Sequence, residues 1–184
     1  MTDGGDRLTI NTRVGQTLGE LAEDFELGLH FAEILEYDHE RRQAGILGQR
    51  YDVRALDAFH GRIDGLGNPD VIVREHGRDA GAYADLKRLD PSKPVTKGDA
   101  DFSRRLEKRL REPFGQDQRI TVAVVDGREA GLTIDAAVRG IRRAIGFWRR
   151  EGRPINPEQR MIVFTGDGSW VVWRGDTEAI SVST

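Results

Sequence analysis

Cysteine is absent from the 184 residues, and its absence excludes several kinds of chemistry. Without thiols there is no disulfide, no thiolate zinc site and no cysteine nucleophile. The histidines show no HExxH or comparable ligand spacing, so we interpret them as surface or structural residues. Any metal ion is therefore expected to be a hard cation bound by carboxylates: Mg²⁺, with Mn²⁺ or another divalent cation as alternatives.

Long apolar runs and a general excess of positive charge are also missing. No stretch approaches the roughly 18 residues that cross a bilayer, and the first 15 residues lack the apolar core of a secretory signal. The net charge of −3 argues against a nucleic-acid coat protein. Arginine and lysine nevertheless dominate residues 103–111 and 139–150, which leaves room for one positive face.

The apolar periodicity predicts an alternation of helices and strands. We expect a flexible arm over residues 1–16 and one domain over 17–184. A helix is predicted over 17–40, broken after it by Gly45 and Gly48, and the stretch 51–67 is read as a short strand and a turn. The further predicted elements are strands 68–73 and 82–89, a helix over 99–112, a strand over 119–125, a helix capped by Thr133, and a hairpin of 161–164 with 170–173. This order indicates a three-layer α/β fold, with a mixed central sheet flanked by helices.

The residues that point to chemistry are Asp70, Asp85 and Lys87 on the first two of those strands. Neighbouring antiparallel strands bring the two aspartates together, and a divalent cation removes the repulsion between them. The carbonyl of Leu86 is a further candidate oxygen ligand. Lys87 shares a strand face with Asp85 because side chains alternate, so its ammonium can orient water or stabilise a phosphoryl transition state.

A structural interpretation of these residues is also open. An aspartate after proline is a common turn residue, and Lys87 can simply occupy an exposed strand face. The setting favours the site, because a Pro-Asp strand, a short turn, the Asp-Leu-Lys strand and a helix follow one another.

Pro69-Asp70 followed by Asp85-Leu86-Lys87 resembles the signature of the PD-(D/E)XK nuclease superfamily. The resemblance implies a restriction-endonuclease-like core over roughly residues 17–165 and a Mg²⁺-dependent endonuclease activity. Members often add an acidic residue from the first helix to the metal site. Glu26 is the first candidate for that residue here, Glu33 on the same flank of the helix is the second, and Glu20 and Glu36 are further alternatives.

The chain is also similar to tRNA-cleaving toxin domains of bacterial contact-dependent inhibition systems. The similarity lies in the run G-N-P-D-V-I-V…A-D-L-K-R-L-D-P, a basic helix, Q-R-I-T-V-A-V-V-D, and the helix start Thr133-Ile134-Asp135-Ala136-Ala137. It implies a cognate immunity protein, and action in the cytoplasm of a target cell after delivery by a larger secreted protein. A DNA endonuclease of restriction or repair and a non-catalytic binding protein are the alternatives. The oligomeric state is left open.

The basic helices are either solvated faces or phosphate contacts. The residues assigned to nucleic-acid binding are Arg104, Arg105, Lys108, Arg142 and Arg143. Tryptophans can stack on unpaired bases. Trp148 is assigned to the core, whereas at most one of Trp170 and Trp173 is expected to be exposed, because they occupy opposite strand faces.

Overall fold

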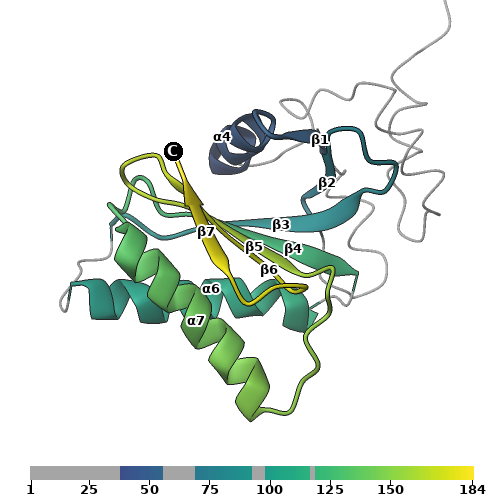
Figure 1. Cartoon of the computed structure of the whole chain (residues 1–184). Helices are drawn as coiled ribbons and strands as arrows, with labels where there is room; N and C mark the ends of the chain where they lie inside the picture. The colour runs from purple at the N-terminus through teal and green to yellow at the C-terminus, as the bar shows by residue number, and fades with distance from the viewer. Residues whose placement is uncertain (1–37, 56–68, 93–97, 117–118) are drawn as a thin grey trace, which may run out of the picture. The chain divides into compact units, whose positions relative to one another are not determined.

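The computed structural model describes residues 38–55, 69–92, 98–116 and 119–184 (Figure 1). The expected arm over 1–16 and nearly all of the helix expected over 17–40 lie outside these ranges. The chain divides into two compact units, with the boundary between Leu86 and Lys87, near the end of strand β3. The two units are described separately.

The first unit contains helix α4 (Asp38–Leu47) and strands β1 (Tyr51–Ala55), β2 (Val71–Glu75) and β3 (Ala82–Arg88). Both β1–β2 and β2–β3 pair antiparallel. The residues Val71, Ile72 and Val73 are all buried, so β2 is covered on both faces. This unit confirms the predicted pairing of the strand after Pro69 with the strand that carries Asp85.

Helix α4 corrects one boundary. We expected Gly45 to break the helical pattern, but α4 continues through Gly45 to Leu47. Gln43, Ala44 and Leu47 are fully buried along one side of the helix. The burial of this side offsets the roughly 1 kcal/mol by which glycine disfavours a helix relative to alanine.

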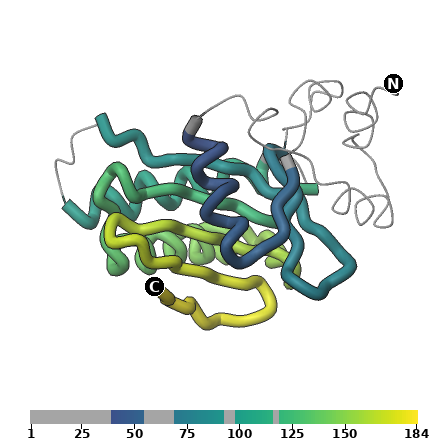
Figure 2. Tube along the Cα trace, turned by 90° about the horizontal axis from the view of Figure 1, so that it is seen from above, coloured from purple at the N-terminus to yellow at the C-terminus, as the bar shows by residue number. Residues whose placement is uncertain are grey.

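The second unit contains two long helices and four strands. Strand β4 (Ile120–Asp126) runs parallel to β5 (Arg160–Phe164), and helix α7 (Ile134–Arg150) connects them. Strands β6 (Trp170–Arg174) and β7 (Ile180–Ser183) then add antiparallel. Helices α6 (Asp99–Gln116) and α7 lie on the same face of these strands, and the chain ends just after β7 (Figures 1 and 2).

The core of this unit follows from strand alternation. Alternate residues of β4, β5 and β6 belong to the core that these strands form with the helices. From β4 these are Ala123 and Val125, and they pack with Leu106, Ile141 and other apolar residues of α6 and α7. Gly140 lets the helices approach closely, since a Cβ at that position would lie only 2.6 Å from Leu106 Cδ2.

Helix α6 is longer than predicted. We expected it to end at Glu112, before Pro113, yet it continues to Gln116. Proline inside a helix costs about 3 kcal/mol. Here Pro113 is buried and the ring of Phe114 packs edge-on against Trp148, with 5.3 Å between centroids. This packing outweighs the local preference to stop.

The cap of α7 is confirmed, since the Thr133 hydroxyl accepts a hydrogen bond from Ala136 N–H at 3.1 Å. Strand β7 was not predicted. The strands of the first unit are antiparallel, those of the second unit are of mixed direction, and each unit contains helices, so the mixed α/β class is confirmed. No helix within the described residues has the length and apolar character that a membrane crossing requires.

Candidate metal site on strands β2 and β3

Strand register brings Asp70 and Asp85 to one place. The β2–β3 ladder ends at the pair of Val71 and Ala84. Asp70 directly precedes this pair and Asp85 directly follows it, and the two carboxyl groups share a side-chain hydrogen bond. The Asp70 N–H donates to the Ala84 carbonyl at 2.9 Å, which holds the residue at the end of the ladder. The predicted approach of the two aspartates is therefore seen in the structure.

The Asp70 carboxylate is oriented by the backbone of β3. The N–H of Leu86 donates to Asp70 Oδ2 at 2.6 Å. This bond fixes one carboxylate oxygen beside the strand that carries Asp85. Leu86 contacts Asp70 through its N–H group. The role of the Leu86 carbonyl as a metal ligand stays a prediction.

The pKa of Asp70 is strongly perturbed in this setting. Burial raises the pKa of Asp70 most, the neighbouring charge of Asp85 raises it further, and its pKa reaches about 8 against an ordinary value of 3.8. The bond from the Leu86 N–H acts in the opposite direction, while a side-chain hydrogen bond with Asp85 adds to the rise. Asp85 itself is only 3% exposed. Such a pair holds a proton at neutral pH unless a cation takes its place.

A third acid acts on this pair from helix α4. The charge of Glu40 also raises the pKa of Asp70, and Glu40 is 9% exposed. Glu40 was not among the predicted site residues, because the predicted helix ended at residue 40. The signal was present: Glu40, Gln43, Ala44 and Leu47 recur at the i, i+3, i+4, i+7 spacing of a buried helix face. Glu26 and Glu33, the predicted helix acids, lie outside the described residues.

Lys87 follows Asp85 by two positions on β3 and is partly buried. Alternation along a strand places the two side chains on the same face. Leu86 between them is buried on the opposite face. The joint action of Asp85 and Lys87 in one site stays a prediction from the Asp85-Leu86-Lys87 spacing.

The donor set of the pair suits a hard divalent cation. Mg²⁺ commonly takes one or two carboxylates and fills its remaining positions with water and substrate oxygens. In the part of the chain that the structure describes, no group of three or more acidic or histidine side chains is placed to hold a metal ion. Glu40 therefore influences the aspartates through its charge rather than as a demonstrated third ligand.

The residues predicted to bind nucleic acid fall into two groups: some form hydrogen bonds within the protein, and the others are exposed to solvent. Arg105 donates to the Asp90 carbonyl at 2.8 Å, and Arg143 donates to Glu107 at 2.8 Å. Arg104, Lys108 and Arg142 are exposed.

The tryptophans are all internal. Trp148, Trp170 and Trp173 are 5%, 4% and 2% exposed. The assignment of Trp148 to the core is confirmed. Stacking of bases on Trp170 or Trp173 is contradicted, since both rings are buried. Trp173 packs in the core beneath the helices and Trp170 packs edge-on against Phe164, so the two opposite strand faces are both covered.

Comparison of the chain with models of protein families, with curated proteins and with solved structures gave no match. The resemblance to PD-(D/E)XK nucleases stays a prediction from the sequence motif.

Proposed function

We propose that this chain is a metal-dependent endonuclease of the PD-(D/E)XK type, with Asp70 and Asp85 as the ligands of a divalent cation. One observation carries the proposal: Asp85 is buried directly beside a second carboxyl whose pKa is raised to about 8. Folding opposes such a pair in the absence of a counter-charge, and strongly perturbed carboxylates are typical of functional sites.

Each residue of the motif has a distinct role in this proposal. A divalent cation, when bound, supplies charge neutralisation and Lewis-acid polarisation of the phosphodiester. Asp70 and Asp85 hold that charge in place, and the Leu86 N–H keeps Asp70 oriented. Lys87 donates from its ammonium to a phosphate oxygen as negative charge develops, or holds the attacking water. Glu40 adds negative charge that strengthens cation binding.

The biological role we favour is that of a toxin-type tRNA nuclease of interbacterial competition, neutralised by a cognate immunity protein. The support for this finer assignment is the similarity of residues 67–91 and 118–137 to such toxin domains. A DNA endonuclease with the same site would differ in its substrate alone, so the test includes both nucleic acids.

The proposal is tested by incubating the full chain with tRNA, another structured RNA and plasmid DNA, in Mg²⁺ and in EDTA. We expect cleavage in Mg²⁺ alone, with tRNA the preferred substrate. Asp85→Asn and Lys87→Gln are each expected to lower the cleavage rate by roughly 10²–10⁴-fold. Glu40→Gln is expected to raise the Mg²⁺ concentration needed for half-maximal rate.

Two matched variants serve as controls. Asp79→Asn alters an exposed aspartate in the β2–β3 connection, and Arg88→Gln alters the exposed residue next to Lys87. Both should cleave like the unaltered chain. Cleavage that persists in EDTA, or an Asp85→Asn variant that remains fully active, contradicts the metal site. Cleavage of DNA alone keeps the nuclease and rejects the tRNA assignment.

A further inference from the structure

A groove of about 480 Å³ lies between helices α6 and α7 in the second unit. Its floor holds small residues, Ala100 and Ser103 from α6 and Gly146 from α7. Five of its eight lining residues are arginines, and no acidic side chain lines it. A concave surface that small residues and arginines line together, without an acidic side chain, is suited to an extended anionic chain.

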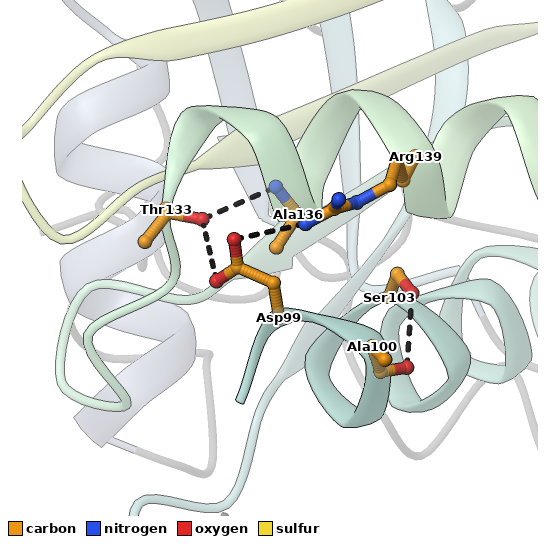
Figure 3. A network of polar contacts seen from close by, with 6 residues as sticks. All are labelled: Asp99, Ala100, Ser103, Thr133, Ala136 and Arg139. Carbon is orange, nitrogen blue, oxygen red and sulfur yellow. Dashed lines mark hydrogen bonds and ion pairs between the residues drawn. The ribbon is translucent and has the colours of Figure 1, made fainter. Parts of the chain in front are cut away.

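Two of the five arginines are already paired and give the groove its shape. Arg139 donates to Asp99 Oδ2 at 2.8 Å, while Asp99 Oδ1 accepts from the Thr133 hydroxyl at 3.1 Å (Figure 3). Figure 3 shows that this network joins the first turn of α6 to the first turns of α7. Farther along, Arg143 donates to Glu107 at 2.8 Å. Each of these pairs joins a side chain of α7 to a side chain of α6.

The remaining three arginines are available. Arg104, Arg142 and Arg150 are exposed, and among the described residues none of them has a hydrogen-bond or ion-pair partner. The Arg150 guanidinium reaches back over Gly146, since a Cβ built on that glycine would lie 3.4 Å from Arg150 Nη1. The three arginines thus line the groove from both helices, Arg104 from α6 and Arg142 and Arg150 from α7.

The spacing suits a nucleic-acid backbone. Arg142 and Arg150 are eight residues apart on α7, about 12 Å along the helix axis. A strand of duplex DNA presents one phosphate per roughly 3.4 Å, so this length matches three to four phosphates. Guanidinium groups match phosphate oxygens with two parallel hydrogen bonds, which an ammonium group does not do.

We infer that the α6–α7 groove binds the phosphate backbone of a nucleic acid through Arg104, Arg142 and Arg150. The choice of nucleic acid over another polyanion rests on the proposed nuclease function. Of the arginines named from the sequence, Arg105 and Arg143 have structural partners, and Arg150, which was not named, takes their place.

The test measures binding by the full chain in EDTA, so that metal-dependent cleavage does not interfere. Labelled tRNA and a DNA duplex are titrated at several salt concentrations. Each of Arg104→Gln, Arg142→Gln and Arg150→Gln is expected to weaken binding about tenfold. The slope of log K against log salt should fall by about 1 for each arginine removed. Replacement by lysine should keep the slope and recover part of the affinity.

The three substitutions are also combined in one groove variant, Arg104→Gln with Arg142→Gln and Arg150→Gln, and a second triple variant with the same change in charge provides its control. Arg88→Gln, Arg149→Gln and Arg153→Gln together remove three exposed arginines that do not line the groove. Circular-dichroism melting checks that both triple variants fold. Loss of binding in the groove variant alone supports the inference. Equal loss in both variants, or no binding by the unaltered chain, overturns it.

Two further results separate the possible failures. Binding of polyglutamate with the same dependence on the three arginines assigns the groove to an acidic protein and overturns the inference. If the groove variants lose binding while no substrate is ever cleaved in Mg²⁺, the groove stands and the proposed function fails. If the unaltered chain cleaves and the groove variants bind as it does, the groove alone is wrong.

Discussion

Strands β3 and β4 each carry a buried aspartate, Asp85 in the middle of β3 and Asp126 at the end of β4, in opposite electrostatic settings. Asp85 on β3 is 3% exposed and Asp126 on β4 is 8% exposed. Asp126 accepts three hydrogen bonds from Arg128: from its N–H at 3.0 Å, Nε at 2.9 Å and Nη2 at 2.6 Å. Asp85 lies beside another acid, Asp70, whose pKa is raised to about 8.

The difference separates a structural acid from a candidate functional one. A buried carboxylate is retained at little cost when its counter-charge comes with it, and Arg128 follows Asp126 by only two residues. Asp70, directly before β2, and Asp85 on β3 bring negative charges together, which opposes folding unless a cation or a proton is bound. The following experiments alter each setting in turn.

The largest effect is expected from Asp70→Asn in EDTA. Because the folded-state pKa of Asp70 lies above its unfolded value of 3.8, the folded chain holds the extra proton between about pH 4 and pH 8. The free energy of unfolding therefore falls as pH rises through this window, by at most about 1.4 kcal/mol per unit. Asp70→Asn removes this dependence on pH. The gain in stability of the variant over the unaltered chain is therefore expected to be larger at pH 8 than at pH 5, by up to about 4 kcal/mol.

Urea unfolding at pH 5, 6, 7 and 8 measures this difference. Asp79→Asn, an exposed change in the same connection, should keep the pH profile of the unaltered chain. Parallel profiles for Asp70→Asn and the unaltered chain would show that the two aspartates do not share a site.

The next effect concerns Mg²⁺ affinity. A proton on the Asp70 carboxyl competes with the cation, so affinity should rise about tenfold per pH unit between pH 6 and 8 and level off above. Calorimetric titration without nucleic acid measures it. Asp85→Asn should abolish the binding, and Asp126→Asn should leave it unchanged. An affinity that does not vary from pH 6 to pH 8 contradicts the raised pKa of Asp70.

Much of this site followed from local rules, and the exceptions have physical causes. The alternation of side chains along a strand and the short β2–β3 connection are sufficient to predict that Asp70 approaches Asp85. Thr133 is a residue type that favours the helix N-cap, so the start of α7 was also predictable. The end of α6 was not predictable, because contacts far along the chain, such as Phe114 on Trp148, stabilise a turn that Pro113 disfavours. Glu40 was missed because Gly45 was taken to break the helix, whereas the apolar face of the helix continues to Leu47.

Strand β7 shows another limit. Its residues Ser181 and Val182 are exposed and Ile180 is only partly buried, so the segment carries little of the alternation that marks a strand. Pairing with β6, with Trp173 opposite Ile180, supplies what the local pattern lacks. Which arginines of α6 and α7 are engaged was equally hidden, because their partners Asp99 and Glu107 are set by helix packing.

On the structural side of the comparison, Asp126→Asn should destabilise the chain by about 2 kcal/mol. The variant leaves the Arg128 guanidinium beside a neutral amide, while partial exposure of Arg128 to water limits the loss. Urea unfolding at pH 7 measures the change, with the exposed Asp176→Asn as control. A loss below about 0.5 kcal/mol would mean that Asp126 depends little on its arginine, and the contrast with Asp85 would weaken.

The smallest effects belong to exposed charges. Arg139 and Asp99 are 51% and 40% exposed, and such pairs contribute at most about 0.5 kcal/mol because water screens them. Arg139→Gln should therefore change stability by no more than that. Thr133→Ala, in the same network, should cost about 1 kcal/mol, because the Ala136 N–H loses its cap. Thermal unfolding of both variants compares a cap with an ion pair at one helix end. If Arg139→Gln lowers the melting temperature more than Thr133→Ala does, the exposed ion pair contributes more to stability than the helix cap, and the low value assigned to exposed charge pairs is wrong.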